Sequence, residues 1–447
     1  MRTDNGLHIG NGLPVRQRQG SSNRQYRPKQ EGHLEDYRLF LVNESRALLT
    51  RLRQVKPFLL SMPMVVAANI SPAAQQGIHQ LLGDNYQELK VKIQLLMAAL
   101  KKGVVQSAED AQGSFAFIKL QFNWLLDSQD IFADVLSQRS EHETGTWLAG
   151  LDALAEDALR IKGNLFAPPP LITYLDRGHG AAIRRARTRL PSGKSNPVAV
   201  IRVPRERMIS NGIASSLIHE VGHQGATSLH LVRSLKVQLQ QKTRTDRPNQ
   251  DLWQWYERWI SEILSDLWSV AHLGIGATTG LINVVSVPSY FVFRLNTDDP
   301  HPPPWIRVKL SLAFGEALFP DPQWKQLSSL WDRLYPLSLI SDARRKTYER
   351  LAALLPEFSR LILQHHSEAL QEHPLQEIFP YRARQPGRLR KLFQSWRNDP
   401  LRMKSFRPAL VFAAIGQARA DNLLTPEKEN EILGKVLVSW ALRRSIS

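Results

Sequence analysis

Apolar side chains recur every three to four positions over most of the chain, which is the spacing that keeps them on one face of an α-helix. The pattern covers residues 34–161, with Gly103 as an interruption. It returns from about residue 321 onward, most clearly over residues 348–364 and 425–443. These stretches predict two helical regions, one on each side of a central segment.

The central segment has a different pattern. The proline run at 168–170 indicates a boundary, and two short apolar runs follow at 171–175 and 198–204, which predict β-strands. Helical periodicity then resumes, and Pro304 is well placed to open another helix. We therefore predict a mainly α (α+β) fold with a small sheet. Its predicted parts are a disordered tail (1–32), an N-terminal helical domain (33–165), a central domain (166–320) and a C-terminal helical domain (321–447).

The composition limits the chemistry that the chain can carry. Its 447 residues include no cysteine, so disulfides and thiolate metal sites are excluded, and only histidine and carboxylate metal ligands remain. Residues 1–32 are rich in Gly, Asn, Gln and Arg and lack the apolar core of a signal peptide, which predicts a disordered basic tail. The protein can be cytoplasmic or exported without a conventional signal peptide, so its localisation stays open.

The formal net charge of +17 raises the question of an acidic partner. Basic residues cluster in the tail, over 184–189 and over 382–397, but no recognised nucleic-acid-binding module accompanies them. We interpret the clusters as solvated faces or as docking patches for acidic partners or anionic surfaces, and we do not expect nucleic acid binding. The uncharged stretch 268–293 is interrupted by glycines and a proline, so it predicts a helix end, a turn and a buried segment instead of a membrane span.

The clearest chemical feature is the sequence His219-Glu220-Val221-Gly222-His223, within a run that has helical periodicity. Histidines four residues apart leave one face of a helix about one turn apart, which is the reach needed to bind one zinc ion. A glutamate beside the first histidine can take a proton from a metal-bound water. The motif predicts two zinc ligands, His219 and His223, with Glu220 as the base.

Such a site needs a third protein ligand and leaves the fourth position to water. An extended motif with a further histidine fails, because positions 226 and 229 hold Ala and Leu. His230 would lie about 10 Å along the axis from His223 in an unbroken helix, which is too far to reach the same ion. We therefore interpret His230 as a residue on the helix face.

The remaining candidate lies on a second helix, predicted over residues 251–273 from apolar residues at helical spacing. Glu262 and Asp266 are four residues apart, so their carboxylates share one face of that helix. Glu262 can act as the third ligand. Asp266 can accept the free ring N–H of a ligating histidine and fix its tautomer.

The motif His-Glu-x-x-His followed downstream by Glu-x-x-x-Asp resembles the gluzincin zinc peptidases. Only the motifs match, over residues 165–320 at most. The resemblance implies a zincin-like catalytic core in the central domain and a bound Zn²⁺. It further implies that His219, His223 and Glu262 bind the ion, that Glu220 is the general base, and that Asp266 orients His219.

The resemblance also implies how the segments around the two motifs are arranged. In gluzincins a strand before the zinc helix lies over the cleft and pairs its edge with the substrate backbone, a role that would fall to 198–204. The segment 224–261 between the motifs is long, although this spacing varies widely among gluzincins. We predict that the zinc helix continues through Leu231, Leu235 and Leu239 before a polar turn.

A further segment, residues 298–308, is similar to a His-Pro…Arg segment of several gluzincins. By that resemblance His301 would hydrogen-bond the oxyanion that develops during hydrolysis, and Arg307 would hold a substrate carbonyl or carboxylate. Three consecutive prolines follow His301 and restrict the backbone there. A donor on a stiff loop suits the stabilisation of developing charge.

These features predict a zinc-dependent peptidase whose substrate is a peptide or protein. The alternative is a non-catalytic interaction or cargo protein with a structural or vestigial zinc site, whose helical regions bind a protein partner. A toxin-like effector peptidase would share the same chemistry. The substrate and the oligomeric state cannot be read from the sequence.

Overall fold

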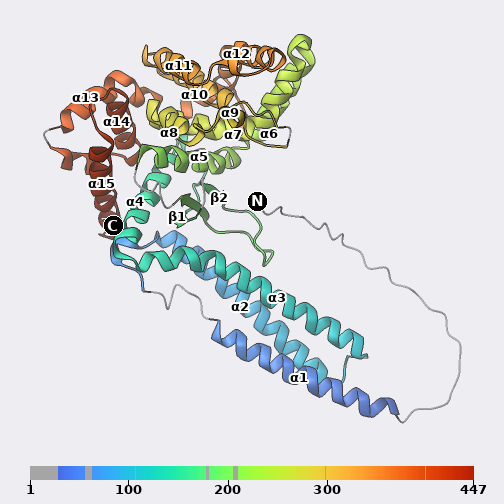
Figure 1. Ribbon diagram of the computed structural model, residues 1–447. Helices are drawn as coiled ribbons and strands as arrows, with labels where there is room; N and C mark the ends of the chain where they lie inside the picture. Colours follow the sequence, from blue (N-terminus) through green and yellow to red (C-terminus); the bar gives the residue numbers. More distant parts are fainter. Residues whose placement is uncertain are drawn as a thin grey trace. The chain divides into compact units, whose positions relative to one another are not determined.

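The computed structural model describes residues 29–55, 63–105, 107–177, 181–204, 210–296, 298–397 and 399–446. Of the predicted disordered tail, residues 1–28 lie outside this range, and residues 29–32 lie within it. The protein is 75% helix and 4% strand, which confirms the mainly helical class with a small sheet. Figure 1 shows the arrangement of the elements.

The strands are β1 (Leu171–Asp176), β2 (Ala182–Arg184) and β3 (Ala199–Pro204). The helices are α1 (Lys29–Gln54), α2 (Pro72–Lys101), α3 (Ala108–Ser137), α4 (His142–Leu159), α5 (Asn211–Ser228), α6 (Leu231–Thr245), α7 (Gln250–Leu273), α8 (Ile275–Val285), α9 (Ser289–Val292), α10 (Pro304–Leu318), α11 (Gln323–Leu334), α12 (Asp342–Leu363), α13 (Pro386–Trp396), α14 (Pro408–Ala420) and α15 (Pro426–Ile446).

The chain forms two compact units. The smaller unit contains α1 up to Arg51, the second part of α2 and the first part of α3, and Arg38 Nη2 donates a hydrogen bond to the Val105 carbonyl within it. The larger unit contains residues 52–89 and 120–447 and therefore all the predicted chemistry. The domain boundaries predicted at residues 32, 165 and 320 stay predictions.

The small sheet lies in the larger unit, with the strand order β1-β3-β2. Strand β3 pairs in parallel with β1 and antiparallel with β2. Both faces of the sheet are buried: Ile201 and Val203 pack into the core that contains α4 and α5, while Ile172 and Val200 pack against parts of α2 and α3. Burial on both faces explains why these strands have apolar runs without polar alternation.

The position of β3 corrects one expectation. The run 198–204 was expected to offer a free edge to the substrate, but β3 is the central strand and pairs on both sides. The sheet edges belong to β1 and to β2. Strand β2 is short and only partly apolar, so the hydrophobic pattern did not predict it.

A second correction concerns the zinc helix. It does not continue through Leu231, because α5 ends at Ser228 and α6 begins at Leu231. His230 between them has a left-handed backbone (φ 53°), which interrupts the helix. Histidine is one of the few residues besides glycine that adopt this conformation with some frequency. Ser234 N still donates to the His230 carbonyl, so the second helix starts at once in a new direction.

The other helices of the central segment agree with their predictions. Helix α7 covers the predicted range, and Gly274 (φ 59°) ends it before α8, in agreement with the predicted turn. Pro304 is the first residue of α10. Among the described residues, no helix combines the length and apolar character that crossing a membrane requires.

Candidate metal centre

The centre is built on the contact between α5 and α7, which approach each other unusually closely. A Cβ added at Gly222 would lie 2.8 Å from Ser265 Cα, and one added at Gly225 would lie 2.3 Å from the Trp268 ring. Only glycine fits at these two positions of α5. Because they lie on either side of His223, the close approach brings the histidine motif directly against the carboxylates of α7.

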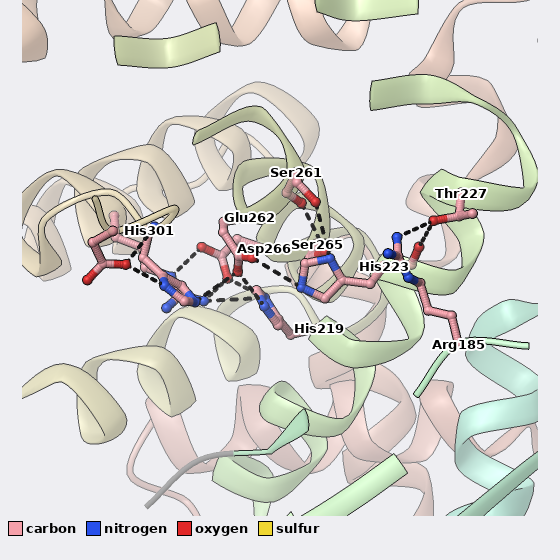
Figure 2. Close-up of polar contacts among 11 residues, drawn as sticks. Arg185, His219, His223, Thr227, Ser261, Glu262, Ser265, Asp266 and His301 are labelled. Carbon is pink, nitrogen blue, oxygen red and sulfur yellow. Dashed lines mark hydrogen bonds and ion pairs between the residues drawn. The ribbon is translucent and has the colours of Figure 1, made fainter. Parts of the chain in front are cut away.

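The two helices bring three candidate ligands to one point, as Figure 2 shows. His219 Nε2 lies 3.1 Å from Glu262 Oε2, and His223 Nε2 lies 3.5 Å from Glu262 Oε1. The ligand atoms of all three side chains lie within 4.8 Å of one another. Of all the residues that the structure describes, this is the single group of three histidine or acidic side chains close enough to hold a metal ion.

These separations fit a metal ion. Nitrogen and carboxylate ligands about 2.0–2.2 Å from a tetrahedral zinc ion are about 3.3–3.6 Å from one another. The two histidine nitrogens lie 3.1 and 3.5 Å from different oxygens of Glu262, and the three ligand atoms fall within 4.8 Å of one another, so the ligands would draw slightly closer together around an ion. The donor set of two imidazoles and one carboxylate suits zinc and leaves one position open.

Asp266 orients the first histidine. Its Oδ1 lies 2.8 Å from His219 Nδ1, so an Nδ1–H donated to Asp266 leaves Nε2 facing Glu262. On its other side Asp266 is held by Arg307, whose Nε and Nη2 donate to Oδ2 and Oδ1 at 2.7 and 2.9 Å. This bidentate ion pair holds the Asp266 carboxylate in place, and the carboxylate in turn holds the His219 ring.

The electrostatics of the centre favour charged groups in spite of burial. Burial alone would lower the pKa of His219, but Asp266 and Glu262 reverse this effect and raise that pKa to about 9. Burial would likewise raise the pKa of Glu262, yet hydrogen bonds from His219 and two other histidines hold that pKa far below its usual value. Burial is also outweighed at Asp266, where Arg307 and His219 lower the pKa of the carboxyl. Both carboxylates are therefore ionised at neutral pH.

Glu220 lies next to the ligands on α5 and is buried. Its carboxylate has no hydrogen-bond or ion-pair partner within the described part of the chain. Its carboxylate oxygens are not among the fully buried polar atoms, so they keep access to a water molecule or a substrate beside the ligands.

His301 and Arg307 both lie at the centre, but only one has the surroundings that the resemblance implies. His301 Nε2 points inward and lies 3.1 Å from Glu262 Oε2, while its Nδ1 lies 2.8 Å from Asp299 Oδ1. The side chain is half exposed, so substrate can reach it. Arg307 is instead engaged by Asp266, with its side chain 14% exposed, and the geometry therefore supports a positioning role.

Two contributors were not singled out from the sequence. Ser261 Oγ lies 3.4 Å from His223 Nδ1, where it can accept the ring N–H, and Asp299 contacts His301. Ser261 precedes Glu262 directly, and Asp299 lies two residues before His301. In the sequence, the only indication of these two roles was a polar residue close to a predicted ligand or hydrogen-bond donor.

The other histidines do not join the centre. His230 lines a separate hollow at the start of α6. His365 contacts Ser234 Oγ at 2.8 Å and Gln238 Oε1 at 3.0 Å, and burial lowers its pKa to about 4. These contacts agree with the absence of a second metal site among the described residues.

Comparisons with known proteins add no relative. No family model, no curated protein and no solved structure matches the chain. The residues of the centre are therefore the basis for proposing a function.

Proposed function

We propose that this protein is a zinc-dependent peptidase of the gluzincin type, with its core built on α5 and α7. The proposal is carried by one observation. Two histidines from α5 and a glutamate from α7 converge with metal-ligand spacing beside a buried carboxylate, Glu220, that has no partner of its own among the described residues.

His219, His223 and Glu262 would hold the ion. A zinc ion bound there would supply Lewis acidity toward a substrate carbonyl and lower the pKa of a water molecule toward 7. Glu220 would take a proton from the attacking water and later give it to the leaving amine. Both steps need a carboxylate that is free to move, which agrees with its lack of a hydrogen-bond or ion-pair partner among the described residues.

The remaining residues position these groups. His301, oriented by Asp299, would turn its Nε2–H from Glu262 to the oxygen that gains charge during attack. Arg307 and Asp266 would keep the His219 ring in the tautomer whose Nε2 faces the ion.

The direct experiment combines metal analysis with unbiased peptide cleavage, on the parent chain and on Glu220→Gln. We expect one zinc per chain in both proteins, and cleavage reduced about 10²–10⁴-fold in the variant, the contribution typical of a general base. Glu257→Gln, at a carboxylate on α7 that is bonded to Gln240 outside the centre, is the matched control and should cleave like the parent.

Two outcomes would overturn the proposal. The first is cleavage by Glu220→Gln at the parental rate. The second is full zinc occupancy in a parent that cleaves no peptide, which would favour the alternative of a non-catalytic interaction protein with a structural or vestigial zinc site.

A further inference from the structure

A hollow of about 530 Å³ adjoins the metal centre on the side of His223. Its wall includes Ser261, whose Oγ lies 3.4 Å from His223 Nδ1. The hollow is therefore directly next to the candidate ligand His223. The polar residues of this basic hollow are Arg185, Thr227, His230, Arg233, Lys236 and Ser261, with Gln240 at its rim. Figure 2 shows Arg185, Thr227, His223 and Ser261 in this order beside the centre.

The hollow has charge of one sign. Three of its side chains are permanently cationic, namely Arg185, Arg233 and Lys236, and none of its described lining residues is acidic. None of the three forms an ion pair with a described carboxylate, whereas many other exposed arginines and lysines of the chain do. Unpaired positive charge gathered in one concave place raises the local concentration of anionic groups.

Arg185 is fixed in place instead of extending freely into solvent. Its Nη1 donates to Thr227 Oγ1 at 2.8 Å, and the Thr227 hydroxyl donates to the His223 carbonyl at 2.8 Å. The backbone beside it is also held to α5, because Ala186 N donates to Gln224 Oε1. A guanidinium has five N–H donors, so a planar edge remains available for a carboxylate after this contact.

The other two cations come from one face of α6. Arg233 and Lys236 are three residues apart, and Val237 and Gln240 continue the same face along the hollow. Both residues line the hollow together with Thr227 of α5, because the chain breaks at His230 and α6 leaves α5 in a new direction, as Figure 1 shows.

We propose that the basic hollow binds an acidic side chain of the substrate, so that the protein selects peptides with Asp or Glu close to the bond that is cut. This inference rests on the proposed peptidase function, and it adds the substrate class to it. A carboxylate can bind bidentately to Arg185 and receive further stabilisation from Arg233 and Lys236.

The cleavage test uses peptide sets that are identical except for Glu, Gln or Lys at each position around the scissile bond. We expect the parent to favour Glu over Lys by about tenfold or more in kcat/KM at one position, and the preference to weaken as salt is added. Arg233→Glu/Lys236→Glu should reverse the preference. Arg388→Glu/Lys391→Glu, at two exposed residues three apart on α13, changes the total charge by the same amount and should keep the preference.

A binding test keeps the inference separate from the proposed function. Zinc-loaded Glu220→Gln is titrated with labelled peptides containing Glu, Gln or Lys, with and without the double charge reversal on α6. Tighter binding of the Glu peptide than of the Gln and Lys peptides, lost when Arg233 and Lys236 are reversed, supports the basic hollow. This result holds even if the parent cleaves nothing and the peptidase proposal fails. Equal binding of all three peptides, or a Glu preference that survives the α6 reversal, would overturn the inference.

Discussion

His219 packs against α7 and His272 lies on it, and both are buried, but their rings have opposite surroundings. Each ring nitrogen of His219 faces a carboxylate oxygen, from Asp266 at 2.8 Å and Glu262 at 3.1 Å. Neither ring nitrogen of His272 has a hydrogen-bond partner within the described residues, and the ring packs against Trp268 and Phe379. The pKa values follow these contacts: that of His219 is raised to about 9, whereas burial and two arginines hold that of His272 well below 6.5.

The comparison shows that burial alone does not make a histidine functional. Burial removes water from both rings and disfavours the charged form of both. The two carboxylates of α7, one turn apart, reverse that effect at His219, and one of them, Glu262, is the candidate third ligand. His272 has no carboxylate beside it, so it is a neutral core residue that carries an energetic cost.

The largest expected effect comes from removing a carboxylate on which this contrast depends. Glu262→Ala deletes one of three protein ligands and should weaken zinc binding on the order of 1,000-fold, since each ligand carries several kcal/mol of the binding free energy. Competition with a chromophoric chelator measures the affinity. His272→Met is the control and should bind zinc like the parent; a similar loss in both variants would mean that the two histidines do not differ as described.

A smaller loss of affinity is expected at the residue that orients His219. Asp266→Asn should weaken zinc binding about 10–100-fold. It also leaves Arg307 buried without its partner, which is expected to reduce the free energy of unfolding by about 3–5 kcal/mol. Adding Arg307→Met should restore stability in denaturant titrations but not zinc affinity. Recovery of both would assign Asp266 a structural role alone.

The raised pKa of His219 predicts how zinc binding depends on pH. Zinc needs the neutral imidazole, but the metal-free ring is protonated below about pH 9. Each unit that the pH falls between about 8.5 and 6.5 should therefore weaken the apparent affinity about tenfold. Proton release, measured by calorimetry in buffers of different ionisation enthalpy, checks this. Binding that is flat over this range would contradict the carboxylate-stabilised imidazolium.

The smallest effect is expected at the contrasting histidine. The folded pKa of His272 is depressed, so its contribution to stability is retained above about pH 6.5 and lost as the pH falls below that value. At pH 5.5 the parent should lose about 1.4 kcal/mol of unfolding free energy from this group, relative to pH 7.5. His272→Met should lack this component in urea titrations at the two pH values. An identical acid loss in both proteins would show that His272 does not behave as a neutral buried base.

Much of the centre could be predicted because its information is local. Residues four apart on a helix share a face, so the pairing of His219 with His223 and of Glu262 with Asp266 followed from spacing alone. The range of α7 followed from its apolar period and from Gly274. These predictions depended on local patterns in the sequence, and the structure agrees with them.

The break after α5 could not be predicted, because no glycine or proline marks it. The apolar stripe through Leu231, Leu235 and Leu239 stays in helical register across the break, and all three are buried. His230 has a left-handed backbone at the break, and α6 packs on α7, a tertiary contact that no local pattern displays. The partner of Arg307 is equally a matter of tertiary structure, since α10 and α7 meet only in the folded protein.

Anomalous diffraction at the zinc edge, from a crystal of the zinc-loaded protein, tests the metal centre directly. We expect one strong peak about 2.0–2.2 Å from His219 Nε2, His223 Nε2 and a Glu262 carboxylate oxygen, with a fourth position open to solvent. A peak elsewhere, or no peak while the three side chains point apart, would contradict this expectation.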